Sequence, residues 1–556
     1  MRRFLPGATL LLGLLACNRE KGSDADSEYG GTLVITAGAD FGPLLPPTIR
    51  WIHENTLVDI VFERLAEPGV ELNSVGDRGF TPELAQSWEW ADDSLSIAFS
   101  LVPGAHFHDG HPLTARDVAF TYDIYTDPRV GSSEGELLSS IDSVTVRDSA
   151  TVVFWFARRY PQQFFDATYH MRIMPEHLLD TVPRRELPTS WYANAPVGSG
   201  QFRFVRREAG ALVELHADTT HVRGRPYLDR IIWTISPDHE AATTRLLAGD
   251  ADFLEQVRPN RLAEIRANQR LGLRPYPSLD VGFLQFNLRD PRRPNAPHPV
   301  LGNRELRRAL AMAIDRQAVI SRVLDSLGVP AHGPFTRALA TADTTIPQFE
   351  YDPARARQIL DSLGWRLRRG AEFRERNGRP LRFTLVSPSS STTRQQMAVI
   401  IQDMLKQVGV RMDLQVMDGG PMMQLLHGQT FDAVFAASHY DPSPSSIRQS
   451  WTTAAQAQGG NLGGYSNRAF DRLVDSATTT LDPEVSAAQY ARAYRMIVAD
   501  APAIWLYEMV NFAGHNTRLE FAEFRADAWW AKIGEWKIRP GGRLPRDGAA
   551  EAAAAN

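Results

Sequence analysis

The stretch TPELAQSWEWADDSLSIAFSLVPGAHFHDGHPLTARDVAFTYD, from Thr81 to Asp123, holds the clearest local patterns in the chain. Every second residue from Leu95 to Leu101 is a large apolar one, as expected for a strand with one buried face. The residues from Thr114 to Asp117 have the spacing of a capping box, which satisfies free backbone N–H groups at the start of a helix. The stretch therefore predicts a strand, a connecting turn and a helix.

The same mixture of strands and helices continues along the chain. Apolar residues at helical spacing follow Asn303 and recur from Met397 to Val408. Gly409 suits the end of the second of these helices, and from Val410 to Val416 every second residue is apolar. A further strand is predicted at Ala503–Tyr507. A helix followed at once by a strand indicates an α/β fold.

The size and composition of the chain are those of a soluble protein with several domains. Of its 556 residues, 43% are hydrophobic and 22% are charged. At roughly 150 residues per domain, this length predicts about three or four core-forming units. The net charge of −5 is small and no long basic block is present. These features predict no nucleic-acid partner.

The N-terminus has the pattern of an export signal. Two arginines precede an apolar stretch from Phe4 to Leu15, which is too short to span a bilayer. The stretch leads into Leu-Leu-Ala-Cys17, which resembles a bacterial lipobox, and Cys17 is the only cysteine in the sequence. We therefore expect 1–17 to be a lipoprotein signal peptide, Cys17 to carry a membrane-anchoring lipid, and 18–29 to be a flexible tether. The alternative is an ordinary signal peptide with a chance cysteine.

No motif of the major enzyme classes that we sought is complete in this sequence. Gly198-Ser199-Gly200 lacks the outer glycines of a nucleophile elbow, and no phosphate-binding loop or dinucleotide fingerprint is present. His106 and His108 form a His-x-His pair that would suit Zn²⁺ or Ni²⁺ on a strand. The alternative to a metal site is a polar turn at Asp109–Gly110, and we favour the turn. We expect no catalytic residue, no cofactor and no metal.

Several segments together resemble one family, the family-five extracellular solute-binding proteins. These are the oligopeptide-, dipeptide- and nickel-binding components of ABC importers. The first segment is Thr81–Asp123, quoted above. The others, in family order, are NRELRRALAMAIDRQAVI (Asn303–Ile320), YDPARARQILDSLGW (Tyr351–Trp365), GGYSNRAFDRLVDSA (Gly463–Ala477) and APAIWLYE (Ala501–Glu508). The resemblance thus extends over nearly the whole chain after the signal peptide.

The resemblance implies a two-lobed, periplasmic-binding-protein-like α/β fold of type II, with an extra small domain on the N-terminal lobe. The implied parts are lobe I at 30–70, 196–277 and 511–545, the extra domain at 71–195, lobe II at 278–510 and a disordered tail at 546–556.

The resemblance also implies a mechanism without bond breaking. The two lobes close around a solute, and the closed form delivers it to a membrane permease. We expect a lipid-anchored, extracytoplasmic monomer that binds peptides or a related small solute. A receptor for a signalling partner, or an enzyme that reuses the fold, would share these lobes.

The segment VFAASHYDPSPSS, from Val434 to Ser446, is where the ligand is expected. Peptide-binding members of the family carry an aspartate four residues before its first proline, and this carboxylate pairs with the α-ammonium group of the peptide. Here that position is Ser438. Three ligands remain open: a peptide bound by another acid, a blocked or non-peptide solute such as an oligosaccharide, and a metal chelate. The predicted ligand-binding residues are Ser438, His439, Tyr440, Asp441, Trp451, Tyr465 and Trp51.

Overall fold

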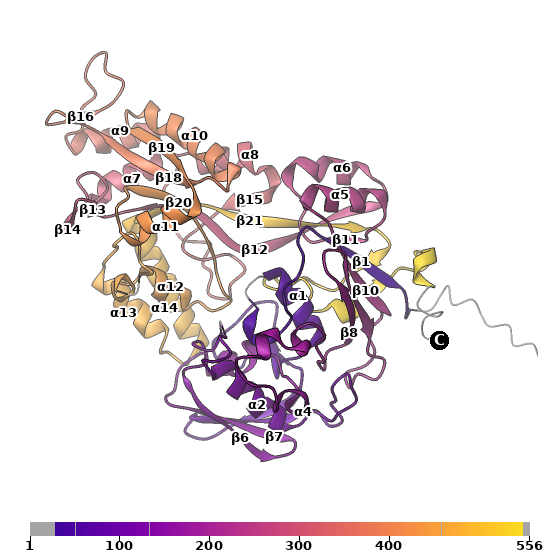
Figure 1. The fold of residues 1–556 in the computed structure, drawn as a ribbon. Coiled ribbons are helices and arrows are strands. Elements are labelled where there is room, and N and C mark those ends of the chain that lie inside the picture. Colours follow the sequence, from indigo (N-terminus) through magenta and orange to yellow (C-terminus); the bar gives the residue numbers. More distant parts are fainter. Residues whose placement is uncertain (1–27, 50–51, 133, 458, 549–556) are drawn as a thin grey trace, which may run out of the picture.

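A computed structural model gives the fold and describes residues 28–49, 52–132, 134–457 and 459–548. Two α/β lobes lie side by side, and a smaller domain lies below the first of them in Figure 1. This arrangement confirms the predicted two-lobed α/β fold with an extra small domain. Cys17 and Trp51 fall outside the described residues.

One mixed sheet passes through both lobes. Its path in the described chain is β19 (Arg411–Met417), β18 (Arg382–Pro388), β20 (Ala433–His439), β12 (Leu271–Phe286), β21 (Ala503–Asn516), β11 (Phe253–Leu254), β1 (Thr32–Ala37), β10 (Arg230–Ile235), β9 (Leu212–Ala217) and β8 (Phe202–Glu208). β15 (Gly328–Pro330) pairs with β21 beside this path. Strands β1, β10, β9 and β8 belong to the first lobe, and β18, β19 and β20 belong to the second.

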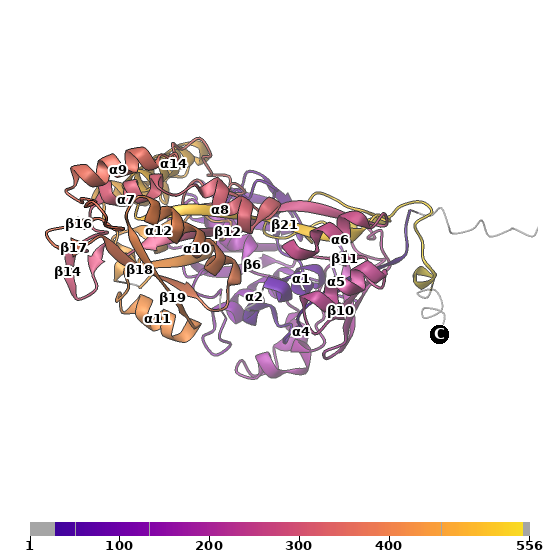
Figure 2. The ribbon, with the colours of Figure 1, turned by 90° about the horizontal axis from the view of Figure 1, so that it is seen from above.

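Two long antiparallel strands, β12 and β21, connect the lobes (Figures 1 and 2). Their register shifts midway: Pro277 lies opposite Val510, whereas Val281 lies opposite Glu508. Three residues of β12 therefore face one residue of β21, which makes a β-bulge. Because a bulge bends a strand and interrupts its hydrogen bonds, we take this point as the hinge of the predicted lobe closure. The domain limits at 277 and 510 remain predictions, and they fall at this bulge.

Helices cover the sheet in both lobes. In the first lobe they are α1 (Ile52–Val61), α5 (His239–Ala248) and α6 (Leu262–Ala267). In the second lobe they are α7 (Arg304–Met312), α8 (Arg316–Val323), α9 (Pro353–Ser362), α10 (Thr392–Gln407), α11 (Gly419–His427), α12 (Ser446–Trp451), α13 (Arg468–Ala477) and α14 (Pro483–Asp500). The predicted helix at Met397–Val408 and the strand after it are α10 and β19, and Gly409 between them has the left-handed φ of 79°. Among the described helices, none has the length and apolar character needed to span a bilayer.

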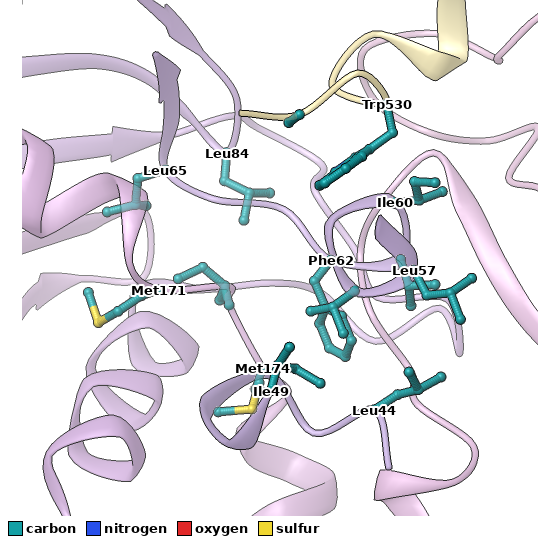
Figure 3. Close-up of a cluster of buried hydrophobic side chains, with 14 of the residues drawn as sticks. Leu44, Ile49, Leu57, Ile60, Phe62, Leu65, Leu84, Met171, Met174 and Trp530 are labelled. Atoms are coloured by element: carbon teal, nitrogen blue, oxygen red, sulfur yellow. The ribbon is translucent and has the colours of Figure 1, made fainter. Parts of the chain in front are cut away.

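The smaller domain contains the patterns quoted first. A separate sheet has the order β4 (Ala85–Trp90), β5 (Ser96–Leu101), β7 (Thr151–Phe156) and β6 (Ile141–Asp148), and α2 (Ala115–Thr126) lies against it. The predicted capping box is present, because the Thr114 N–H donates to Asp117 Oδ2 at 2.8 Å. The domain shares its core with the first lobe: Figure 3 shows Leu44, Leu57 and Phe62 gathered with Met171 and Met174. The two therefore form one continuous body.

The histidine-rich segment is a turn, as predicted. The Gly110 N–H donates to the Phe107 carbonyl at 2.8 Å, and Gly110 has a φ of 85°. His108 is tied to the backbone, since its Nε2 contacts the Gly200 carbonyl at 2.8 Å. Among the residues that the structure describes, no group of three or more His, Cys, Asp and Glu side chains could hold a metal ion.

Candidate functional site

The predicted site lies at the end of β20, directly beside the hinge. β20 pairs antiparallel with β12, so that Ser438 lies opposite Val281 and His439 lies opposite Asp280. Because successive side chains of a strand point to opposite faces, Ser438 and Tyr440 share one face and His439 lies on the other. The hinge bulge thus places the end of this strand at the boundary between the lobes.

His439 and Asp280 form an ion pair at this boundary. His439 Nδ1 lies 3.0 Å from Asp280 Oδ1, and the Ser278 hydroxyl donates to Asp280 Oδ2 at 2.6 Å. The hydrogen bond to Asp280 raises the pKa of His439, and the negative charges of Asp441 and Asp527 add to this. Burial disfavours the Asp280 carboxylate, but its bonds to His439 and Ser278 outweigh burial and lower its pKa. The sequence patterns did not predict Asp280 as a site residue, because it lies 159 residues from His439 in the chain.

Ser438 is partly exposed, whereas three of the predicted aromatic residues are buried in the second-lobe core. The Trp451 ring lies 5.0 Å from Trp505 and 6.0 Å from Phe283, measured between centroids. The Tyr465 hydroxyl donates to Asp500 Oδ2 at 2.8 Å. Tyr440 is 3% exposed, and burial raises the pKa of its phenol. These three side chains are therefore part of the second-lobe core. Ligand contact by these residues and by Trp51 stays a prediction.

Residues of the smaller domain reach the second lobe around this site. The Gln162 amide donates to the Ser443 hydroxyl, which joins the smaller domain to the loop after β20. Leu72 is 1% exposed, and it packs in the same cluster as Leu279 of the hinge. Asp441 is exposed beside these contacts. The site therefore lies between the second lobe and the body that the smaller domain forms with the first lobe.

A separate cavity of about 450 Å³ lies between the first lobe and the smaller domain. Glu63, Glu67, Glu83 and Arg223 are among its lining residues. Burial, together with the neighbouring carboxylates of Glu67 and Glu63, raises the pKa of Glu83 to about 7 despite its ion pair with Arg223. No second-lobe residue lines this cavity, so it is distinct from the site at the hinge.

Comparison with known proteins identifies the family. Residues 79–459 match the model for the middle part of the bacterial extracellular solute-binding proteins, family 5. The chain belongs to this family. Several solved structures share this fold over almost the whole chain.

Proteins similar to this chain differ in the ligands that their names state. The chain is 25% identical over 547 residues to the oligopeptide-binding protein AppA of Bacillus subtilis, covering 94% of this chain and 96% of AppA. The structure of AppA in complex with a nonapeptide matches with a TM-score of 0.69 over 92% of this chain and 99% of that one. The chain is also 25% identical over 554 residues to heme-binding protein A of Haemophilus influenzae, covering 93% and 95%.

The fold likeness extends to proteins with lower sequence identity. The ABC transporter substrate-binding protein CtaP of Listeria monocytogenes has a TM-score of 0.79 at 21% identity, covering 92% of this chain and 99% of that one. At this identity, the match shows the fold alone.

Proposed function

We propose that this solute-binding protein captures peptides between its lobes and delivers them to the membrane permease of an ABC importer. It acts as an extracytoplasmic, lipid-anchored monomer and performs no chemistry on the ligand. The observation that carries the proposal is the hinge, where β12 and β21 change register beside the end of β20.

The hinge geometry supports capture by closure. A ligand favours the closed form only if it binds that form more tightly than the open form. Side chains from both bodies border the end of β20, including Gln162 from the smaller domain and Ser443 from the second lobe. A ligand between them gains contacts with both bodies only when the bodies approach, so binding and closure are coupled.

The likeness to AppA over almost the full length of both chains supports a peptide as the ligand. One observation favours a second candidate, a non-peptide solute. Ser438 is uncharged, so it cannot neutralise an α-ammonium group by itself. The likeness to heme-binding protein A is equally extensive, and that name states a non-peptide ligand.

The lipid anchor at Cys17 is part of the proposal. The first described residues lie on the first lobe, where the Thr32 N–H donates to Asp547 Oδ1 at 2.8 Å. A tether that precedes β1 would therefore hold the protein by its first lobe and leave the second lobe free to move. Anchoring also raises the effective concentration of the binder at the permease.

A thermal-shift series tests the proposed function. The full chain, purified from membranes in detergent, is heated with short peptides that have free or acetylated N-termini, with oligosaccharides and with Ni²⁺ chelates. A ligand that binds only the folded state adds about 2.7 kcal/mol at a hundredfold excess over Kd. Stabilisation by peptides supports the proposal. Stabilisation by sugars or chelates alone would replace it with the second candidate.

A further inference from the structure

Three parallel strands of the first lobe end at the edge of the sheet that faces the hinge. β1 pairs parallel with both β10 and β11, so all three strands end at the same edge of the sheet. β11 is antiparallel to β21, which enters from the second lobe, with Phe253 opposite His515. The carboxyl ends of the parallel strands therefore face the second lobe. In open α/β sheets, ligands bind at this end of the strands.

Glu255 is the first residue after β11, and it lies at this edge. Its backbone carbonyl accepts a hydrogen bond from the Tyr276 hydroxyl at 3.2 Å, and Tyr276 immediately precedes the hinge bulge. The next residue, Gln256, donates to Asn511 Oδ1 of β21 at 2.9 Å. Glu255 is thus held between the two hinge strands and the first-lobe sheet.

The Glu255 carboxylate is partly buried, and none of the residues that the structure describes forms an ion pair with it. Burial raises its pKa, and the indole N–H of nearby Trp529 offsets this only in part. Arg274 lies over the ring of Phe524, 5.1 Å from its centroid, instead of pairing with this carboxylate. A carboxylate withdrawn from water without a counter-ion costs stability, so the presence of one at the hinge indicates a role in binding.

Three other carboxylates near the hinge either have a cationic partner or are exposed to water. Asp280 pairs with His439, and Asp527 pairs with Arg525 at 2.6 Å. Asp441 is exposed to solvent, where an ion pair contributes little. Glu255 differs from these carboxylates in having no ion-pair partner among the described residues. The neighbouring Tyr276 and Trp529 are buried in the first-lobe core with Phe524.

We propose that Glu255 binds a cationic group of the ligand, the α-ammonium or a basic side chain of a peptide, from the first lobe. The charge that Ser438 lacks on the second lobe is then supplied across the hinge. This inference rests on the proposed peptide-binding function. It also makes closure charge-dependent, because a cation held at the end of β20 meets Glu255 only when the lobes approach.

Calorimetric titration of the full chain in detergent tests the inference with three peptides of equal length. One has a free N-terminus and no basic side chain, one is acetylated and neutral, and one is acetylated with a central lysine. The Glu255→Gln protein should bind the peptide that carries the recognised cation at least about tenfold more weakly. It should bind the neutral peptide as the wild type does. The control Glu264→Gln removes an exposed carboxylate of the same lobe that pairs with Arg261 at 3.1 Å, and it should change nothing.

The pattern of losses separates the possible outcomes. A loss confined to the free N-terminus assigns Glu255 to the α-ammonium, and a loss confined to the lysine peptide assigns it to side chains. Unchanged binding of all three peptides by the Glu255→Gln protein overturns the inference alone. Wild-type protein that binds none of them contradicts the proposed peptide function, and the inference falls with it.

A stability measurement guards against a trivial loss of binding. Glu255→Gln removes a partly buried charge that has no ion-pair partner among the described residues, so the Tm of this variant without ligand should equal or exceed that of the wild type. If the Glu255→Gln protein fails to fold, Glu255→Asp tests the inference. It keeps the charge but withdraws it by one methylene group, and the same selective loss is expected.

Discussion

His439 Nδ1 lies 3.0 Å from Asp280 Oδ1, which joins the last residue of β20 to the hinge bulge of β12. The two residues lie directly opposite each other in neighbouring strands, so the pair needs no movement of either backbone to form. The pair holds the end of β20 against the hinge bulge.

The His439 pair predicts a pH dependence of stability. Its partner raises the folded-state pKa of His439 above the ordinary value near 6.5. The stabilisation is therefore fully present below about pH 6.5 and is lost as the pH rises through the folded-state pKa. The unfolding free energy of wild type minus that of His439→Gln should shrink as the pH rises above about 6.5. The effect is small because the side chain is 43% exposed.

A control for this measurement is His427→Gln, which removes an exposed histidine of α11 away from the hinge. Its difference from wild type should not follow that of His439→Gln. Equal pH profiles for the two variants would mean that the Asp280 pair contributes nothing in solution.

Glu83 predicts a pH dependence of the same sign at the junction of the first lobe and the smaller domain, here as a penalty that appears when the pH rises. Its folded-state pKa of about 7 exceeds the ordinary value for glutamate, so ionisation of this group is disfavoured in the folded protein. The penalty is absent below about pH 4 and complete above about pH 8. Glu83→Gln should raise the unfolding free energy at about pH 8 by up to about 3 kcal/mol and leave it unchanged at about pH 4.

Urea unfolding of the variant at both pH values checks this expectation. The matched control is Glu89→Gln, an exposed glutamate on β4 of the smaller domain. A stabilisation at low pH, or an equal one in the control, would show that the gain does not come from ionisation of Glu83.

The hydrogen bond between Gln162 and Ser443 predicts a bias toward closure. It spans the two bodies, and a single neutral hydrogen bond contributes about 0.5–1.5 kcal/mol. Gln162→Ala should therefore shift the closed-to-open ratio of the ligand-free protein toward the open form by roughly two- to tenfold. Small-angle X-ray scattering would record this as a larger radius of gyration.

Ser443 also contacts Ser445, with 2.7 Å between the two hydroxyls, so a single Ser443 variant would disturb more than one bond. A double-mutant cycle of Gln162→Ala and Ser443→Ala isolates the cross-domain bond. Fully additive effects would mean that this bond does not contribute to closure.

Trp451 separates a packing role from a ligand-contact role. It is 2% exposed and lies against Phe283 and Trp505, so Trp451→Ala should lower the unfolding free energy by about 3–5 kcal/mol without ligand. Thermal unfolding of the ligand-free protein measures the loss. Unchanged stability together with weakened ligand binding would instead assign the residue to the ligand wall.

Local patterns were sufficient to predict much of the fold. The alternation in β5, the capping box of α2 and the α10–β19 unit depend on neighbouring residues, whose steric and hydrogen-bonding preferences act within a few positions. The family resemblance over ordered segments then implied two lobes and an extra domain, which the structure and the family match confirm.

The predicted site illustrates the limit of such patterns. The position of β20 and the shared face of Ser438 and Tyr440 follow from the period of a strand. Burial of Tyr440, Trp451 and Tyr465 does not, because it depends on α12, α13 and α14 packing beneath the sheet.

Patterns among neighbouring residues were enough to predict the local elements, the fold class and the family of this protein. They did not predict that β21 continues nine residues beyond Ala503–Tyr507 and pairs with β12, more than 200 residues away in the chain. Pairing between distant strands also places Asp280 opposite His439 and brings the end of β11, next to Glu255, against β21. Residues far apart in the chain meet because strands pair and cores close, and no local pattern encodes these meetings.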